Sequence, residues 1–84
     1  MARIIDGNKM NMIGKNVKRL RKERKINQQT LSTLLELMGV YVCRGSISRI
    51  EDQSRTVTDI ELFAIAKALR VDINDLIEKE NFEE

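Results

Sequence analysis

Residues 27–51 have the sequence NQQTLSTLLELMGVYVCRGSISRIE, which predicts two short helices joined by a turn. Apolar residues recur at helical spacing as far as Met38, and the following Gly39 is suited to end a helix. The second helix carries only Ile47 and Ile50 as apolar side chains, among arginines and serines. We therefore expect one side of this helix to pack against a core and the other side to face outward.

Three helix starts share one arrangement, in which a polar N-cap residue lies between two apolar residues that pack around it. They are Ile26-Asn27 with Leu31, Val57-Thr58 with Leu62, and Val71-Asp72 with Leu76. Together with the apolar periodicity they predict an all-α fold, a compact domain of five helices. The helices are expected over residues 12 to about 25, 28 to near 39, 44 to about 52, 59 to about 69 and 73 to about 80.

The remaining segments divide the chain into an N-terminal arm over residues 1–11, the domain over residues 12–80 and an acidic tail over residues 81–84. The apolar positions of each helix define the expected core. Its members are Ile13, Val17, Leu20, Leu31, Leu34, Leu35, Met38, Ile47, Ile50, Leu62, Phe63, Ala66, Leu69, Leu76 and Ile77.

The composition excludes several classes of site. The chain has no histidine and a single cysteine, Cys43, so an intramolecular disulfide and a Cys-based zinc site are excluded and no metal or cofactor is expected. No nucleophile has a base beside it, and we expect no enzyme activity. No apolar run approaches the ~20 residues of a membrane span, and no signal peptide is visible, so the chain is expected to be cytoplasmic without membrane contact.

Charge is divided unequally along the chain. Residues 1–56 hold 12 Lys and Arg against 5 Asp and Glu, a net charge of +7, whereas residues 57–84 hold 3 against 8, a net charge of −5. Seven of the basic residues lie between Lys15 and Lys25. This asymmetry predicts one surface suited to a polyanion, although a solvated lysine-rich helix face remains the alternative.

The sequence resembles the lambda-repressor-like (XRE/Cro-type) helix-turn-helix DNA-binding domain family from about Ile13 to Ile77. The segments that carry the resemblance are IGKNVKRLRKERKINQQTL before the turn, SISRIE after it, and LFAIAKALRVDINDLI at the end of the domain. The resemblance implies double-stranded DNA as the partner, with the helix at about residues 44–52 in the major groove.

The resemblance also assigns roles to individual residues. It implies base reading by Arg44, Gly45 and Arg49, phosphate contacts by Asn27, Gln28 and Arg55, and a structural ion pair between Arg21 and Glu51. Ser46 and Ser48 carry small hydroxyls suited to a base edge or a phosphate oxygen, and we assign Ser46 to base reading and Ser48 to a phosphate contact. Alternatives stay open for several of them. Ser46 and Ser48 are equally suited to local hydrogen bonds, Asn27 to plain helix capping, and either arginine of the reading helix to a phosphate contact.

The chain departs from the family in having extra residues between the two central helices, and Glu36 to Val42 is their expected place. Tyr41 in this segment is expected to pack on apolar surface, and Cys43 to be a small, partly buried residue. Gln53 replaces a frequent family glycine, so the turn there is expected to differ. Gly45 in a first helical turn suggests close approach of the backbone to DNA.

The interpretation is a sequence-specific DNA-binding transcriptional regulator, a repressor, whose affinity comes mostly from the basic first helix and from phosphate contacts. A homodimer is expected, through the last helix and the tail with Phe82. The alternative is a protein-interaction module, antitoxin-like or an adaptor, which uses the acidic residues 72–84 and binds DNA secondarily.

Overall fold

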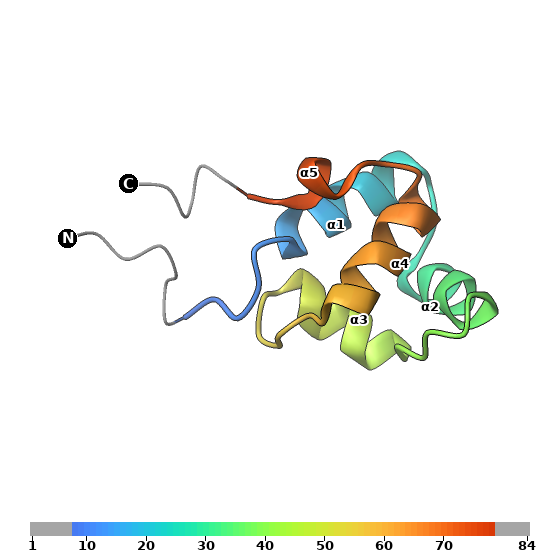
Figure 1. The fold of residues 1–84 in the computed structure, drawn as a ribbon, viewed down its shortest axis with the longest axis horizontal. Helices are drawn as coiled ribbons and strands as arrows, with labels where there is room; N and C mark the ends of the chain where they lie inside the picture. The colour runs from blue at the N-terminus through green and yellow to red at the C-terminus, as the bar shows by residue number, and fades with distance from the viewer. Residues whose placement is uncertain (1–7, 79–84) are drawn as a thin grey trace.

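The computed structural model describes residues 8–78, and within them the chain forms five helices (Figure 1). They are α1 (Gly14–Glu23), α2 (Gln28–Leu37), α3 (Arg44–Glu51), α4 (Asp59–Leu69) and α5 (Ile73–Leu76). The all-α prediction is confirmed. The first seven residues of the expected arm and the whole acidic tail, with Phe82, lie outside the described residues.

Local sequence signals set most helix boundaries. Asn27 caps α2, because its Oδ1 accepts a hydrogen bond of 2.7 Å from the backbone N–H of Thr30. Thr58 and Glu61 exchange side-chain and backbone hydrogen bonds of 3.1 and 3.0 Å at the start of α4, which is a capping box. After α2, Gly39 has a φ of +82°, the left-handed conformation expected of a residue that ends a helix.

The last helix is shorter than expected, since it ends at Leu76 and not near residue 80. Ile77 is already extended, with φ −79° and ψ 126°. The next N–H, of Glu78, donates a hydrogen bond of 2.7 Å to the carbonyl of Met12. A contact with the segment before α1 thus replaces the continuation of the helix.

The core lies where the inward sides of all five helices meet. Its buried apolar residues are Ile13, Val17, Leu20, Leu31, Leu35, Val42, Ile47, Ile50, Ala64, Ile65, Ala66, Leu69 and Leu76. Two expected core residues, Met38 and Phe63, are exposed, so that prediction was wrong. Met38 follows the last turn of α2, and Phe63 lies on the side of α4 opposite the buried Ile65.

A buried polar cluster of Asn11, Gln53 and Glu78 joins the two ends of the domain to the loop after α3. Asn11 donates to the carbonyl of Ile50 at 3.0 Å and accepts from the N–H of Gly14 at 2.8 Å. Gln53 donates to the Oε2 of Glu78 at 2.9 Å. Every group in the cluster therefore has a partner, as burial of polar atoms requires.

Gln53 has a φ of +65°, the left-handed conformation that a glycine adopts without strain. The backbone at this position thus has a conformation that suits a glycine, although the residue is a glutamine. The buried side chain of Gln53 donates to the carbonyl of Asn11 at 3.1 Å in addition to Glu78. These contacts offset the strain of a non-glycine residue there.

The helix α1 packs very closely on the end of α3 at Gly14. A Cβ atom at this position would lie 2.3 Å from the carbonyl oxygen of Ile50 and 2.9 Å from that of Glu51. Only a residue without a side chain allows this approach. Within residues 8–78 no helix has the length and apolar character needed to span a membrane.

Candidate nucleic-acid interface

The segment between α2 and α3 is held at Val42 and in part at Val40, which packs against the core. The hydroxyl of Ser32 on α2 donates a hydrogen bond of 2.6 Å to the carbonyl of Val42, whose side chain is buried. Leu37 and Tyr41 are 80% exposed, so the expected packing of Tyr41 was wrong. The side chains of Leu37 and Tyr41 therefore project from the surface, while Val42 fixes where α3 begins.

The helix α3 has one buried side and one outward side. Ile47, Ile50 and Glu51 face the interior. The exposed residues on the other side are Arg44, Gly45, Ser48 and Arg49, and Ser46 is half-buried beside them. All four residues expected to read bases therefore lie on the outward side of α3, together with Ser48, which is expected to contact phosphate.

Few interactions restrain this outward side. In the part of the chain that the structure describes, the side chains of Arg44 and Ser48 make no hydrogen bond, and Arg49 is 3.4 Å from the hydroxyl of Ser46, a long contact. A Cβ atom on Gly45 would meet only the guanidinium of Arg49, at 3.7 Å. The protein itself does not require a glycine there.

A hollow joins the start of α2 to the start of α3. The residues that line it are Arg21, Asn27, Gln28, Gln29 and Arg44. The first backbone N–H groups of α2 have no partner within the helix and carry the positive end of its dipole, so this is a place where an anion is favoured. The geometry brings Asn27, Gln28 and Arg44 together at this hollow.

Gln28, besides lining this hollow, makes a hydrogen bond that the sequence did not indicate. Its side-chain amide donates a hydrogen bond of 3.1 Å to the Oε1 of Glu51. The same carboxylate accepts from Arg21, through Nε at 2.7 Å and Nη2 at 3.1 Å. Glu51 therefore ties α1 and the start of α2 to the end of α3.

The pair of Arg21 and Glu51 lies inside the domain. The two side chains are only 9% and 3% exposed, and Arg21 also donates to the carbonyl of Ile26 at 2.9 Å. The fork of the guanidinium thus meets a carboxylate in the two-bond geometry that gives the strongest pairs. This is a structural contact at the edge of the candidate interface.

Arg55 is already engaged by a neighbouring carboxylate. Its guanidinium donates to the two oxygens of Glu61 at 3.0 and 2.9 Å and to the carbonyl of Thr56 at 3.1 Å. The hydrogen bond from Arg55 lowers the pKa of the Glu61 carboxyl, and the same bond raises the pKa of Arg55. A phosphate at Arg55 would have to share or displace this partner.

The Arg55–Glu61 pair makes stability depend on pH. A carboxylate whose pKa is lowered by folding stabilises the fold above its ordinary pKa of about 4.3, and this contribution is lost as the pH falls through the lowered value. We expect Glu61→Gln to be less stable than the parent chain at neutral pH and the difference to shrink at about pH 3. Urea unfolding at both pH values measures the difference in stability between the variant and the parent chain. A difference that stays constant with pH contradicts the pairing of Arg55 with an ionised Glu61. Glu36→Gln, at an exposed position, is the control.

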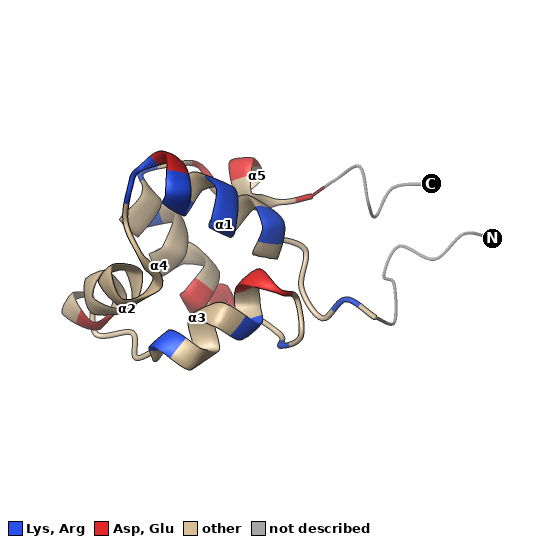
Figure 2. Ribbon diagram, turned by 180° about the vertical axis from the view of Figure 1, so that it is seen from behind, with Lys and Arg blue, Asp and Glu red and all other residues tan. Residues whose placement is uncertain are grey.

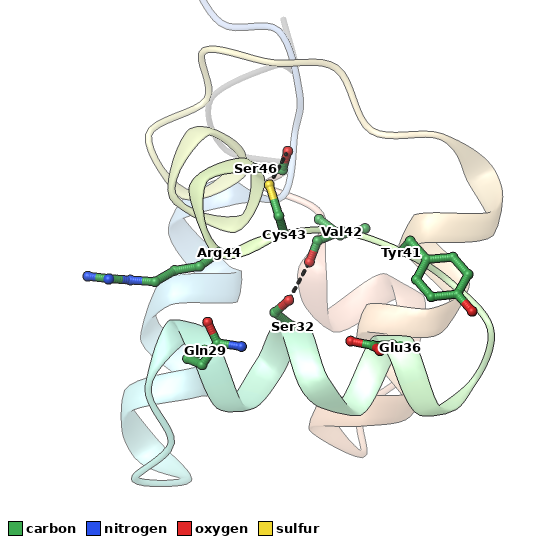
Figure 3. A pocket seen from close by; sticks show the side chains of 8 residues that line it. All are labelled: Gln29, Ser32, Glu36, Tyr41, Val42, Cys43, Arg44 and Ser46. Atoms are coloured by element: carbon green, nitrogen blue, oxygen red, sulfur yellow. Dashed lines mark hydrogen bonds between the residues drawn. The ribbon is translucent and has the colours of Figure 1, made fainter.

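A second hollow lies between α2 and the start of α3 (Figure 3). Its lining consists of Gln29, Ser32, Glu36, Tyr41, Val42, Cys43, Arg44 and Ser46. Figure 3 shows Arg44 and Tyr41 at opposite ends of it. Cys43 is exposed, contrary to expectation, and a hydrogen bond with Ser46, 3.4 Å away, lowers the pKa of its thiol.

The basic residues of α1 form a surface separate from the outward side of α3. Lys15, Lys18, Arg19 and Lys22 are exposed on the side of α1 away from Val17 and Leu20. Figure 2 shows the Lys and Arg residues of α1 at the upper side of the molecule and α3 at the lower side. The charge that dominates the sequence is therefore not on the helix expected to read DNA.

Sequence reasoning missed Gln29 and a buried polar cluster. Gln29 lines both hollows, and only its place one residue after Gln28 in the first turn of α2 could have indicated it. The cluster of Asn11, Gln53 and Glu78 joins residues up to 67 positions apart in the chain, from 11 to 78, and no local pattern marks it. Among the described residues no group of His, Cys, Asp or Glu could hold a metal ion.

Comparisons with known proteins give one family and one solved structure. A family model described as helix-turn-helix matches residues 17–76. The chain is similar to the P22 c2 repressor protein, solved in complex with a synthetic operator in the presence of Tl⁺, with a TM-score of 0.68 and 26% sequence identity. That similarity covers 81% of this chain and 96% of the P22 chain. No curated protein gives a significant match to the sequence.

Proposed function

The chain belongs to the helix-turn-helix family of lambda-repressor-like domains, and from that premise we propose that it is a sequence-specific DNA-binding transcriptional regulator. The observation that carries the proposal is the outward side of α3, where Arg49 is exposed and Arg44 lines the anion-favouring hollow at the start of α2. A helix of this kind fits the major groove, while the flanking helix start meets the DNA backbone. Family and fold are those of DNA-binding regulators, and we propose no catalytic role.

Arg44 and Arg49 are the proposed base-reading residues of greatest weight. An arginine in the major groove donates two hydrogen bonds to the O6 and N7 of guanine, and each good pair contributes ~1–3 kcal/mol of discrimination against other bases. Ser46 lies between them, within 3.4 Å of Arg49, where its hydroxyl can orient that guanidinium or meet a base edge. Gly45 leaves room for close approach of the duplex.

The proposed phosphate contacts come from two sides of α3. Asn27 and Gln28 present the first N–H groups of α2, and the contact of Gln28 with Glu51 holds its side chain in place for this role. Ser48 and Arg55 would meet the other strand, Arg55 by exchanging Glu61 for a phosphate oxygen. Such contacts fix the position of the protein on DNA and make its affinity depend on salt.

The protein is further proposed to act as a repressor and as a homodimer on a palindromic site. Two-fold symmetry would place the two copies of α3 in successive major grooves, about one helical turn or ~34 Å apart. The acidic residues that the alternative, a protein-interaction module, would use have other partners among the described residues. Asp75 accepts from the N–H of Asp72 at the start of α5, and Glu78 belongs to the buried polar cluster.

Selection of bound duplexes from a random DNA pool, at two salt concentrations, tests the proposed function. We expect a palindromic consensus that persists at the higher salt concentration, while total binding falls steeply with salt. Binding without any sequence preference at either concentration would contradict the proposal. It would leave at most a basic protein that associates with DNA through charge.

A further inference from the structure

The loop between α3 and α4, residues 52–58, is held by a buried side chain from the segment before α1. The amide nitrogen of Asn11 donates a hydrogen bond of 3.0 Å to the carbonyl of Ile50 and one of 2.9 Å to the carbonyl of Arg55. The first carbonyl belongs to the last turn of α3 and the second to the loop itself. One NH2 group therefore joins the two ends of the turn that leads out of α3.

The oxygen of the same side chain is engaged at the start of α1. It accepts hydrogen bonds from the backbone N–H groups of Ile13 at 3.1 Å and of Gly14 at 2.8 Å. Asn11 thus makes all four hydrogen bonds that an asparagine side chain can make, and it is only 8% exposed. A buried side chain with every bond made has one orientation, so the loop is fixed relative to α1.

The backbone around Asn11 strengthens this attachment. The N–H of Met10 donates to the carbonyl of Gln53 at 2.9 Å, and the side chain of Gln53 donates to the carbonyl of Asn11 at 3.1 Å. Figure 1 shows the segment before α1, in blue, beside the loop after α3, in yellow. The helix-turn-helix model matches residues 17–76, so Asn11 lies before the matched part and its role does not follow from the family.

Arg55 is held at two places by two different residues. Its guanidinium meets the carboxylate of Glu61, whereas its carbonyl is bound by Asn11, so loss of the first contact leaves the second in place. We propose that Asn11 is a positioning residue of the DNA interface, which fixes the backbone at Arg55 while the guanidinium exchanges Glu61 for a phosphate oxygen. A loop that is already ordered loses less conformational freedom on binding. The inference rests on the proposed function, since it concerns a proposed phosphate contact.

Asn11→Ser tests this role in DNA binding. Serine keeps an oxygen that can cap α1, but its hydroxyl has a single proton and cannot hold both carbonyls. Affinity for the selected operator and for a scrambled duplex should fall alike, roughly two- to tenfold, the effect of having to order one mobile side chain on binding. Asn16→Ser is the matched control and should bind like the parent chain, because Asn16 donates to the carbonyl of Leu76, away from the loop. Equal losses for the two variants would overturn the inference.

A double-variant cycle with Arg55→Gln separates positioning from a general loss of stability. If Asn11 acts through Arg55, Asn11→Ser should weaken DNA binding in the parent chain and have little further effect in Arg55→Gln. The four chains are compared at a temperature at which thermal unfolding shows each of them to be folded. The same fold-loss in both backgrounds would contradict a positioning role.

Hydrogen exchange of the protein without DNA tests the attachment itself. Asn11→Asp keeps the shape of the side chain and its acceptor oxygen, but a carboxylate cannot donate to the two carbonyls. The amide of Ser54, which donates to the carbonyl of Arg49 at 2.9 Å, should then exchange about tenfold faster, and that of Leu31 in α2 should change much less. Unchanged exchange at Ser54 would show that Asn11 does not hold the loop.

The failure of this inference can be told from failure of the proposed function. A parent chain without any sequence preference contradicts the proposed function, whatever Asn11 does. A parent chain that prefers its operator, together with an Asn11→Ser variant that binds equally tightly, contradicts only the positioning role.

Discussion

Gly14→Ala is expected to destabilise the fold by about 3 kcal/mol or more, although it adds one methyl group to a helix. In a solvent-exposed helix the change from glycine to alanine stabilises by up to ~1 kcal/mol. Here the new Cβ would lie 2.3 Å from the carbonyl oxygen of Ile50 and 2.7 Å from the Cγ of Gln53. Because a backbone oxygen cannot turn aside, α1 must move away from α3.

Thermal and urea unfolding measure this effect, which for a domain of this size corresponds to a fall in Tm on the order of 15 °C. Gly45→Ala is the matched control, since it too lies in the first turn of a helix but its Cβ would meet only Arg49 at 3.7 Å. We expect its stability to be unchanged or slightly higher. Equal effects of the two substitutions would show that α1 and α3 are not packed as described.

Glu51→Ala should cost about 3–5 kcal/mol, because it strands the buried guanidinium of Arg21. Glu51 accepts two hydrogen bonds from Arg21 and one from Gln28, so its removal leaves donors of both residues without a partner. Glu36→Ala, at an exposed position of α2, should change the stability by no more than about 0.5 kcal/mol.

The double variant Arg21→Met with Glu51→Leu distinguishes the loss of the pair from the cost of a stranded charge. Replacing both partners by apolar residues of similar size removes the unpaired charge, and much of the stability should return. Urea unfolding of the parent chain, Glu51→Ala, Glu36→Ala and the double variant measures these stabilities. Small and equal effects of Glu51→Ala and Glu36→Ala would be incompatible with a buried pair.

Most of the helical framework could be predicted because its signals are local. Asn27 caps a helix through a bond to Thr30, three residues away, and Gly39 ends the same helix by its own conformation. The end of α5 could not be predicted in this way. It is set by the hydrogen bond from Glu78 to Met12, between distant parts of the chain.

In the candidate site, too, features set by local sequence could be predicted and features set by contacts formed on folding could not. The free side of α3 could be predicted, because Ile47 and Ile50 leave one side of a short helix to polar residues. The partners of Gln28 and Arg55 could not, since the carboxylates of Glu51 and Glu61 reach them only after folding. Phe63 was assigned to the core because it is apolar, whereas its direction depends on which side of α4 the other helices cover.

The most direct test of the account compares Arg49→Ala with the parent chain in binding the selected operator and a scrambled duplex at one salt concentration. If α3 reads bases, the substitution should reduce the ratio of the two affinities roughly 5- to 150-fold, which corresponds to about 1–3 kcal/mol of discrimination. Binding to the scrambled duplex should weaken much less than binding to the operator. Lys22→Ala, on the exposed side of α1, should leave the ratio unchanged. An unchanged ratio for Arg49→Ala, with both affinities lowered alike, would contradict the claim that this arginine of α3 reads DNA sequence.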